Sequence, residues 1–361
     1  MIFNPEKPFN ELPFIPPQKD RYETIKVWKQ ESKARSALAE LKGIANIIPN
    51  QSILINAIVL QEAKDSSEIE NIITTQDKLY KAVSLSVKSK LDPETKEVLY
   101  YRGALFEGYN ISQDKGVLTI NDIIKIQTII VKNNAGIRKL PGTALVNDKT
   151  GSTIYTPPQD LDIIKKLMRN FAEYLNNNDD SLIKLAILHH QFESIHPFYD
   201  GNGSRTGRII NILYLLLKKH LDIPILYLSS FLIKNKSDYY KLLLETTKND
   251  VWEDWILFIL KGIELTAIET IAKIKAIKTL LAETIDKVRE KASKIYSKEL
   301  VELLFEHPYC KNEFIIKNIG VERKAASRYL HKLEEIGILE RYKIGKENIY
   351  INKELMKVLT A

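Results

Sequence analysis

Apolar positions recur at helical spacing along most of this 361-residue chain. Glycines, prolines and β-branched residues interrupt the rhythm at 136–158, which predicts a short hairpin. Residues 1–20 are proline-rich and are expected to lie extended on the surface. The pattern predicts a mainly α fold, with helices over 22–42, 53–63, 76–92, 93–113, 120–133, 160–176, 181–194 and 262–295. From 206 to about 260 the chain is also expected to be helical.

The last segment, residues 296–361, changes character. Three helical stretches precede two predicted strands around Gly345 and Lys346. This order describes a winged helix-turn-helix, with the third helix as recognition element and the hairpin as wing. The basic residues Lys324, Arg328 and Lys332 share one face of the third helix. Nine Lys and three Arg stand against ten Glu here, a net charge of +2. This charge leaves DNA binding, protein docking and a purely structural cap all open.

Composition adds few constraints. The single cysteine, Cys310, excludes internal disulfides and suggests a reducing compartment. The N-terminus lacks a signal pattern, and the longest apolar runs are about half a membrane span. We therefore expect a cytoplasmic protein without a membrane partner. The net charge of +7 allows contact with nucleic acid without requiring it. The expected parts are an N-terminal helical region over 1–110, a helical core over 111–260, a linking helix over 261–295 and the winged segment over 296–361.

Residues 196–208, HPFYDGNGSRTGR, concentrate the candidate chemistry. They lie between two apolar helical stretches, where the second helix begins and its first N–H groups are unpaired. Gly201 and Gly203 flank Asn202 and allow successive main-chain N–H groups to point at one anion. Asp200 is an oxygen ligand of the kind that Mg²⁺ takes beside substrate phosphates. The loop is therefore suited to a polyphosphate and a metal ion.

Three further side chains of the loop add to this picture. Arg205 and Arg208 stand one helical turn apart, and arginine binds phosphate oxygens with two donors at once. His196 can accept a proton from an attacking hydroxyl. Pro197 and Phe198 have a structural character, since they can stiffen the loop and anchor it in the core. Each feature alone is commonly structural, but their combination in thirteen residues indicates a reactive site.

The loop resembles the signature of the Fic family, HPFx[D/E]GNGRxxR, whose members typically transfer AMP from ATP to a protein hydroxyl. One departure exists: Ser204 stands where the family has its first arginine. Either Ser204 is a one-residue insertion, or it takes that arginine's place and the register slips. We prefer the insertion, because it keeps both arginines in role. The resemblance covers residues 20–260 and implies a Fic-type helical bundle, with His196 as base, Asp200 on Mg²⁺, and ATP held by Phe198, Gly201, Asn202, Gly203, Ser204, Arg205, Arg208, Tyr239 and Tyr240.

Residues 66–71, SSEIEN, fit a second Fic-associated pattern, [S/T]xxxE[G/N]. Ser66 and Glu70 are four apart and share one helix face, as many solvated Ser/Glu pairs do. The resemblance implies that this inhibitory segment, with Ser66, Glu70 and Asn71, restrains the enzyme because Glu70 pairs with Arg208 and removes a phosphate ligand. The hairpin at 136–158 then resembles the flap that holds a target segment by strand pairing. The two tyrosines, Tyr239 and Tyr240, are candidates for packing on adenine or ordinary core aromatics.

The sequence therefore predicts a nucleotidyltransferase that moves AMP from ATP to a Ser, Thr or Tyr hydroxyl of a target protein, the chain itself among the candidates. Three alternatives stay open. The loop could transfer another nucleotide or phosphate group, or it could remove AMP while Glu70 orients a water. The protein could also be a nucleotide-sensing regulator that binds DNA through 296–361. A homodimer is compatible with all of them.

Overall fold

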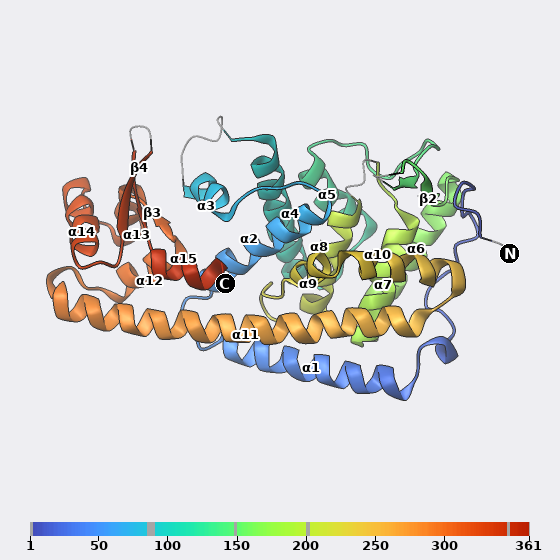
Figure 1. The fold of residues 1–361 in the computed structure, drawn as a ribbon, viewed down its shortest axis with the longest axis horizontal. Helices are drawn as coiled ribbons and strands as arrows, with labels where there is room; N and C mark the ends of the chain where they lie inside the picture. Colours follow the sequence, from blue (N-terminus) through green and yellow to red (C-terminus); the bar gives the residue numbers. More distant parts are fainter. Residues whose placement is uncertain (1–2, 85–90, 148–149, 200–202, 345–346, 361) are drawn as a thin grey trace.

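The computed structural model describes residues 3–84, 91–147, 150–199, 203–344 and 347–360. Within them the fold is mainly α, as predicted, with two small antiparallel sheets (Figure 1). After a 3-10 turn, η1 (Lys19–Arg21), the helices up to residue 291 are α1 (Ile25–Ala45), α2 (Gln51–Ile69), α3 (Gln76–Ser84), α4 (Pro93–Lys115), α5 (Ile120–Val131), α6 (Leu161–Asn176), α7 (Leu182–Ile195), α8 (Gly203–Leu217), α9 (Leu228–Lys234), α10 (Lys236–Asn249) and α11 (Trp252–Lys291).

Polar caps set the start of several helices. The Asp92 carboxylate accepts a hydrogen bond from the N–H of Thr95 at 2.9 Å, and Pro93 opens α4. Thr119 and Asp122 form a reciprocal capping box at the start of α5. These side chains satisfy N–H groups that have no partner inside the helix. The predicted starts at 93 and 120 coincide with the observed ones for this reason.

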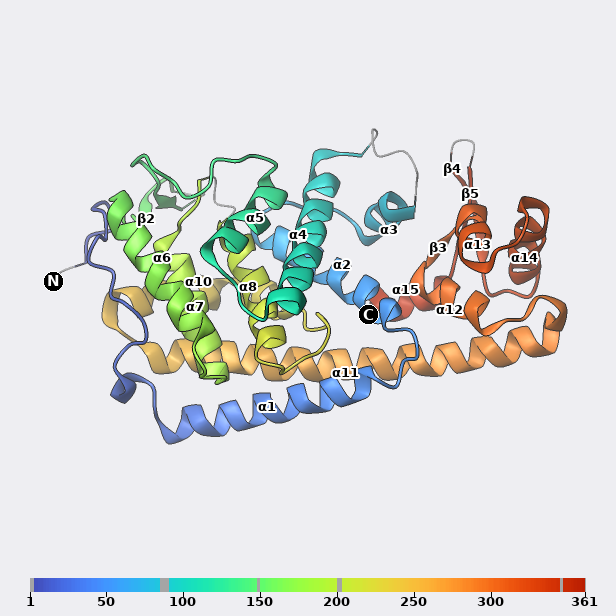
Figure 2. The same cartoon turned by 180° about the vertical axis from the view of Figure 1, so that it is seen from behind.

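The long helix α11 runs along the whole molecule, with α1 beside it on one side and the bundle of α2, α4, α7 and α8 on the other (Figures 1 and 2). Helices α1 and α11 run in the same direction. Their first turns are joined by Lys26 and Glu253 at 3.3 Å, and later turns of both by Glu40 and Lys275 at 3.6 Å. The helix crosses the domain boundary expected at 260 without a break. Gly262 lies inside it, where a Cβ atom would stand 2.6 Å from the ring of Phe231. The glycine thus permits the close approach of α9.

The helical character predicted over 206–260 is confirmed, and it is divided among several helices. The segment folds as α8, α9 and α10, followed by the start of α11. Lys219, just after α8, has a left-handed φ of 60°, and Pro224 has no main-chain N–H to continue a helix. The break lets α9 pack against α2 and α11 and brings the start of α10 to the end of α2. The helix predicted over 76–92 is α3, and residues 85–90 lie outside the described part.

The predicted hairpin contains β1 (Leu145–Val146) and β2 (Thr153–Tyr155), which pair antiparallel. The proline-rich N-terminus, which contains two turns, lies beside it. The N–H of Phe9 donates to the carbonyl of Thr156 at 2.9 Å, and the Thr156 hydroxyl donates to the carbonyl of Pro5 at 2.6 Å. Residues near the start of the chain therefore bind the hairpin just after β2, at Thr156.

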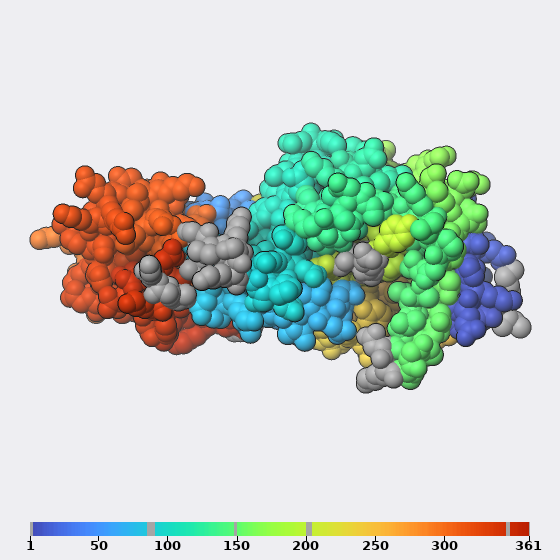
Figure 3. Space-filling view, turned by 90° about the horizontal axis from the view of Figure 1, so that it is seen from above, coloured from blue at the N-terminus to red at the C-terminus, as the bar shows by residue number. Residues whose placement is uncertain are grey.

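The C-terminal part begins with η3 (Ser293–Ile295), and helices α12 (Lys298–Glu306), α13 (Asn312–Ile319) and α14 (Arg323–Glu335) precede the strands β4 (Glu340–Ile344) and β5 (Glu347–Ile351). Two elements were not predicted. They are β3 (Tyr309–Cys310), in a sheet of order β3-β5-β4, and α15 (Lys353–Thr360). Figure 3 shows this part gathered at one end of the molecule. Tyr309 connects it to α3, because its ring stacks on Tyr80 at 5.7 Å and its hydroxyl donates to Asp77 at 2.6 Å.

Candidate active site

His196 stands at the end of the buried helix α7. It adopts a left-handed conformation, with φ of 45°, and its N–H donates to the carbonyl of Phe192 at 3.1 Å. The side chain of Phe198 is fully buried, with its ring 6.2 Å from that of Phe192. Phe198, expected at the nucleotide site, is therefore a core anchor for the start of the loop. It fixes where the imidazole of His196 lies.

The flap segment pairs with this loop through its main chain. Ile137 forms an isolated antiparallel bridge with Phe198, and the N–H of Arg138 donates to the carbonyl of Pro197 at 2.9 Å. The hydroxyl of Tyr199 accepts from the N–H of Lys139 at 2.7 Å. The first strand-like stretch of 136–158 and the loop after α7 consequently form one unit.

Arg138 is a site residue that the sequence did not reveal. Its side chain is fully buried, and its guanidinium donates to the carbonyls of His196 at 2.8 Å and Ile195 at 3.3 Å, and to that of Pro158. One arginine thus joins the end of α7 to the end of the flap. An arginine among glycines and prolines reads as a surface residue, and no local pattern marks its burial.

His196 is held in its neutral form. Its side chain is buried, and burial, followed by the positive charge of Arg138, lowers the pKa of the imidazole to about 4. At neutral pH the ring therefore carries one proton and keeps one nitrogen free to accept another. This is the protonation state that a general base requires.

Arg208 is bound by residues 66–71, the segment that the resemblance implies to be inhibitory. Its Nε donates to the Ser66 hydroxyl at 2.7 Å, and its Nη2 donates to the Ser66 carbonyl and to Glu70 Oε1, both at 2.9 Å. Burial opposes the charge of this arginine, but Glu70 in particular raises the pKa of the Arg208 guanidinium above its usual value. The ion pair that the resemblance implies between Glu70 and Arg208 is thus present in the fold.

The segment 66–71 begins in the last turn of α2, which runs on from the helical stretch predicted at 53–63. Glu70 caps this helix, and Asn71 follows with a left-handed φ of 61°. Only glycine adopts that conformation freely, and asparagine tolerates it best among the other residues. The pattern E[G/N] therefore has a physical reason, since the residue after the glutamate must reverse the chain.

Arg205 lies one turn before Arg208 on α8 and is ion-paired as well. Its Nη2 stands 3.2 Å from Glu97 Oε2, a carboxylate on α4. Ser204, the departure from the family pattern, donates from its hydroxyl to Glu193 Oε2 at 2.5 Å. Arg205 and Arg208 both pair with carboxylates of the N-terminal region, Glu97 and Glu70.

Glu193 is a buried acid beside this pair of arginines. Burial raises the pKa of its carboxyl to about 7, against the opposing charge of Arg208 and the hydrogen bond from Ser204. Its second oxygen, Oε1, is buried without a hydrogen-bond partner among the described residues. Near neutral pH this side chain can therefore gain or lose a proton inside the site.

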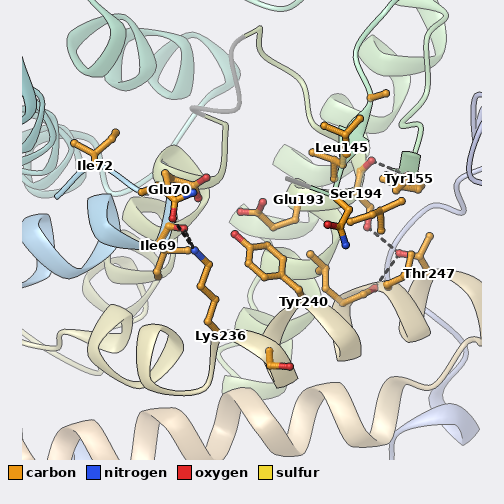
Figure 4. Close-up of a pocket in the computed structure, with 18 of the residues that line it drawn as sticks. Ile69, Glu70, Ile72, Leu145, Tyr155, Glu193, Ser194, Lys236, Tyr240 and Thr247 are labelled. Atoms are coloured by element: carbon orange, nitrogen blue, oxygen red, sulfur yellow. Dashed lines mark hydrogen bonds between the residues drawn. The ribbon is translucent and has the colours of Figure 1, made fainter. Parts of the chain in front are cut away.

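A cavity of about 1160 Å³ opens in front of these residues. Figure 4 shows Glu70 and Lys236 on one side, Leu145 and Tyr155 of the flap on the other, and Glu193 with Tyr240 between them. The two predicted tyrosines separate here. Tyr240 lines the cavity, whereas Tyr239 is buried and bonds His189 Nε2 through its hydroxyl at 3.0 Å. Of the two tyrosines, Tyr240 is the one that lines the cavity.

Some predictions fall on residues of which the structure says nothing. Asp200, Gly201 and Asn202 lie outside the described part, and Gly203 is the first residue of α8. Among the described residues no group of three or more His, Cys, Asp and Glu could hold a metal ion. None of the described helices is long and apolar enough to cross a membrane.

The basic face expected on the third helix of the C-terminal part is sparse. Lys324 and Arg328 are exposed on α14, but Lys332 pairs with Glu335 at 2.9 Å. Lys343 is exposed on β4, and Lys346 lies outside the described residues. DNA binding by this part stays a prediction.

Comparison with known proteins places these features in a family context. Residues 117–215 match the model of the Fic/DOC family, residues 28–110 that of the Fic/DOC family N-terminal, and residues 280–355 that of the protein adenylyltransferase SoFic-like, C-terminal domain. A curated relative, the protein adenylyltransferase Fic of Nematostella vectensis, is 27% identical over 191 residues, which cover 50% of this chain and 41% of the relative. The match thus spans less than half of that relative's length.

Solved structures show the same fold. A Fic family protein from Desulfovibrio desulfuricans G20 aligns with a TM-score of 0.58 at 17% identity, covering 94% of this chain and 98% of its own. Fic-1 from C. elegans aligns with a TM-score of 0.52 at 18% identity, covering 69% of this chain and 74% of its own. At such identities the likeness concerns the fold alone.

Proposed function

The chain belongs to the Fic/DOC family, and from this premise we propose that it is a protein adenylyltransferase that transfers AMP from ATP to a Ser, Thr or Tyr hydroxyl of a target protein. One observation carries the proposal. A buried, neutral His196 lies on the same helix–loop–helix unit as Arg205 and Arg208, and Glu97 and Glu70, the partners of these two arginines, line one large cavity. A proton acceptor and a paired phosphate-binding site are the parts that transfer of a nucleotidyl group needs.

In the proposed reaction, His196 takes the proton of the target hydroxyl. The hydroxyl oxygen forms a bond to the α-phosphorus of ATP, and the bond from that phosphorus to the oxygen bridging to the β-phosphate breaks. Pyrophosphate leaves with the electron pair. Arg205 and Arg208 would neutralise the charge on the leaving phosphates once their carboxylate partners release them. Positioning and electrostatics supply most of the rate, and the base adds about 10²–10⁴-fold.

Mg²⁺ belongs to the proposal on the chemistry of the donors. One carboxylate together with substrate phosphate oxygens is the usual way in which proteins hold this ion. Asp200, in the signature loop, would be that carboxylate, with ATP supplying the other oxygens. The bound ion would neutralise charge on the polyphosphate.

The proposal includes inhibition by Glu70. The Glu70 carboxylate accepts a hydrogen bond from Nη2 of Arg208 at 2.9 Å, so this donor is no longer open to a phosphate oxygen. The carboxylate also places negative charge where a triphosphate would lie. Both effects weaken ATP binding in a productive position. Removal of the side chain should therefore raise activity.

A target segment would dock on the flap. In the described sheet β1 pairs only with β2, so its other edge can accept a strand, and Val146 on β1 is 51% exposed. Main-chain pairing positions a target hydroxyl while placing few demands on its sequence. The neighbouring Arg138 ties this flap to His196 and keeps the docking edge in register with the base.

The experiment incubates the Glu70→Gly protein with labelled ATP and measures the label transferred to protein. The intact mass of the labelled protein is then determined. We expect label from the α position and a mass increase of one AMP. His196→Ala should reduce the rate at least a hundredfold, because the base is lost, while His331→Ala, an exposed histidine on α14, should leave it unchanged. Retained activity in His196→Ala would exclude the base role. Modification by another nucleotide, or loss of AMP from a modified protein, would replace adenylyl transfer by one of the alternatives.

A further inference from the structure

Lys236 contacts the end of the inhibitory segment from across the cavity. It is the first residue of α10, and its Nζ donates to the carbonyl of Ile69 at 2.6 Å and to Asn71 Oδ1 at 3.4 Å. Figure 4 shows the ammonium reaching toward Ile69 directly below Glu70. The residue lies 167 positions after Ile69 in the sequence, so this contact arises only in the fold.

The contact acts on the peptide group that carries Glu70. The carbonyl of Ser67 accepts two main-chain N–H groups of the following turn, and the carbonyl of Glu68 accepts another, all at 3.0 Å. The carbonyl of Ile69 accepts the ammonium of Lys236. Because this carbonyl belongs to the peptide unit that joins Ile69 to Glu70, its orientation sets the direction in which the Glu70 side chain leaves the main chain.

The position of Lys236 in α10 supports a role in α2. A cation at the start of a helix lies at the positive end of the dipole and is unfavourable for that helix. The same ammonium lies at the carboxyl end of α2, where a cation is favourable and can satisfy a carbonyl without an intrahelical partner. The charge of this lysine therefore stabilises the carboxyl end of α2 and slightly destabilises the start of α10.

We propose that Lys236 is a positioning residue for inhibition, holding the last turn of α2 so that Glu70 stays paired with Arg208. This inference rests on the proposed function, since it concerns the control of the same site. Release of the Lys236–Ile69 hydrogen bond would let the turn at Asn71 relax and move the carboxylate away from the guanidinium. A signal that displaced the start of α10 would then activate the enzyme.

Substitution of the lysine tests the proposal directly. Lys236→Met removes the ammonium and keeps the length of the side chain, and Lys236→Arg keeps a cationic donor. Loss of a hydrogen bond from a charged donor should raise AMP transfer roughly tenfold, and Lys236→Arg should stay near the parent rate. The matched control is Lys234→Met, because Lys234 is exposed on α9 and its ammonium pairs with Glu269 of α11 at 3.3 Å.

A second readout does not depend on catalysis. The main-chain N–H groups of Glu70 and Asn71 are bonded within the turn at 3.0 Å, and their hydrogen exchange reports how long the turn stays closed. We expect faster exchange of both in Lys236→Met and parent-like exchange in Lys236→Arg and Lys234→Met. Parent-like exchange and an unchanged rate in Lys236→Met would overturn the proposal.

The Glu70→Gly background separates the possible causes. With the carboxylate gone, Lys236→Met should give no further rise in kcat, because the lysine acts through Glu70. A raised KM in this background would instead make Lys236 a nucleotide ligand and overturn the positioning role. If Glu70→Gly is itself no faster than the parent, inhibition by Glu70 fails as part of the proposed function, and hydrogen exchange alone decides whether Lys236 holds the turn.

Discussion

Replacement of Arg138 by methionine should separate the flap from the catalytic loop. The guanidinium is the common donor to three carbonyls, those of Ile195, His196 and Pro158, which belong to the end of α7 and the end of the flap. Methionine fills similar space but donates nothing. The variant should fold less stably, and its flap should lose its fixed position beside His196.

The magnitude follows from the contacts. A hydrogen bond to a charged group contributes about 1.5–3 kcal/mol, so three such bonds set an upper limit of several kcal/mol. Burial lowers the pKa of Arg138, which shows that desolvation of the guanidinium opposes this gain. We therefore expect a net loss of about 3 kcal/mol in the free energy of unfolding.

The assay combines urea unfolding with AMP transfer in the Glu70→Gly background, so that inhibition does not mask a change in rate. The matched control is Arg169→Met, which removes an exposed arginine from α6. We expect the transfer rate to fall about tenfold or more, because misplacement of the flap removes the alignment of target and base. Unfolding and transfer indistinguishable from those of Arg169→Met would refute the role assigned to Arg138.

Other residues of the site give further predictions. The pKa of His196 lies near 4, so this base stays deprotonated from pH 8 down to about pH 5. In the Glu193→Gln protein kcat/KM should therefore stay level over this pH range. A fall in kcat/KM centred near pH 6.5 would contradict the buried base. The Glu193 carboxyl has a pKa of about 7 and becomes negatively charged as the pH rises. In steady-state kinetics the KM for ATP should therefore increase from pH 6 to 8 in the parent and stay constant in Glu193→Gln. Identical pH profiles of KM in the two proteins would exclude this effect. Glu97→Gln should lower the KM for ATP roughly two- to fivefold, because it removes the ion pair to Arg205. The effect is modest because the side chain of Glu97 is 42% exposed, and solvent weakens the pair. An unchanged or higher KM would show that the Glu97–Arg205 pair does not compete with ATP.

The sequence predicted the features that depend on local spacing. Ser66 and Glu70 are one turn apart on α2, so a shared face followed from their separation, and both contact Arg208. The helix starts predicted at 93 and 120 are confirmed, and Asp92 and Thr119 cap these helices within a single turn. The shared helix face and the caps depend only on residues within one helical turn.

Features that depend on distant partners could not be predicted. Arg138 bonds a carbonyl 58 positions away, Glu97 meets an arginine 108 positions away, and Lys236 meets a carbonyl 167 positions away. Nothing in the sequence around these residues distinguishes them from solvated charges. Neighbours on a helix also point in different directions, which is why Tyr239 entered the core while Tyr240 lines the cavity.

The most direct test of adenylyl transfer uses the Glu70→Gly protein, a cell lysate and ATP labelled at either the α or the γ phosphate. The account predicts protein bands labelled from the α position alone, their loss in the Glu70→Gly/His196→Ala protein, and weaker labelling by the parent. Label transferred from the γ position, or α-label that persists without His196, would contradict it.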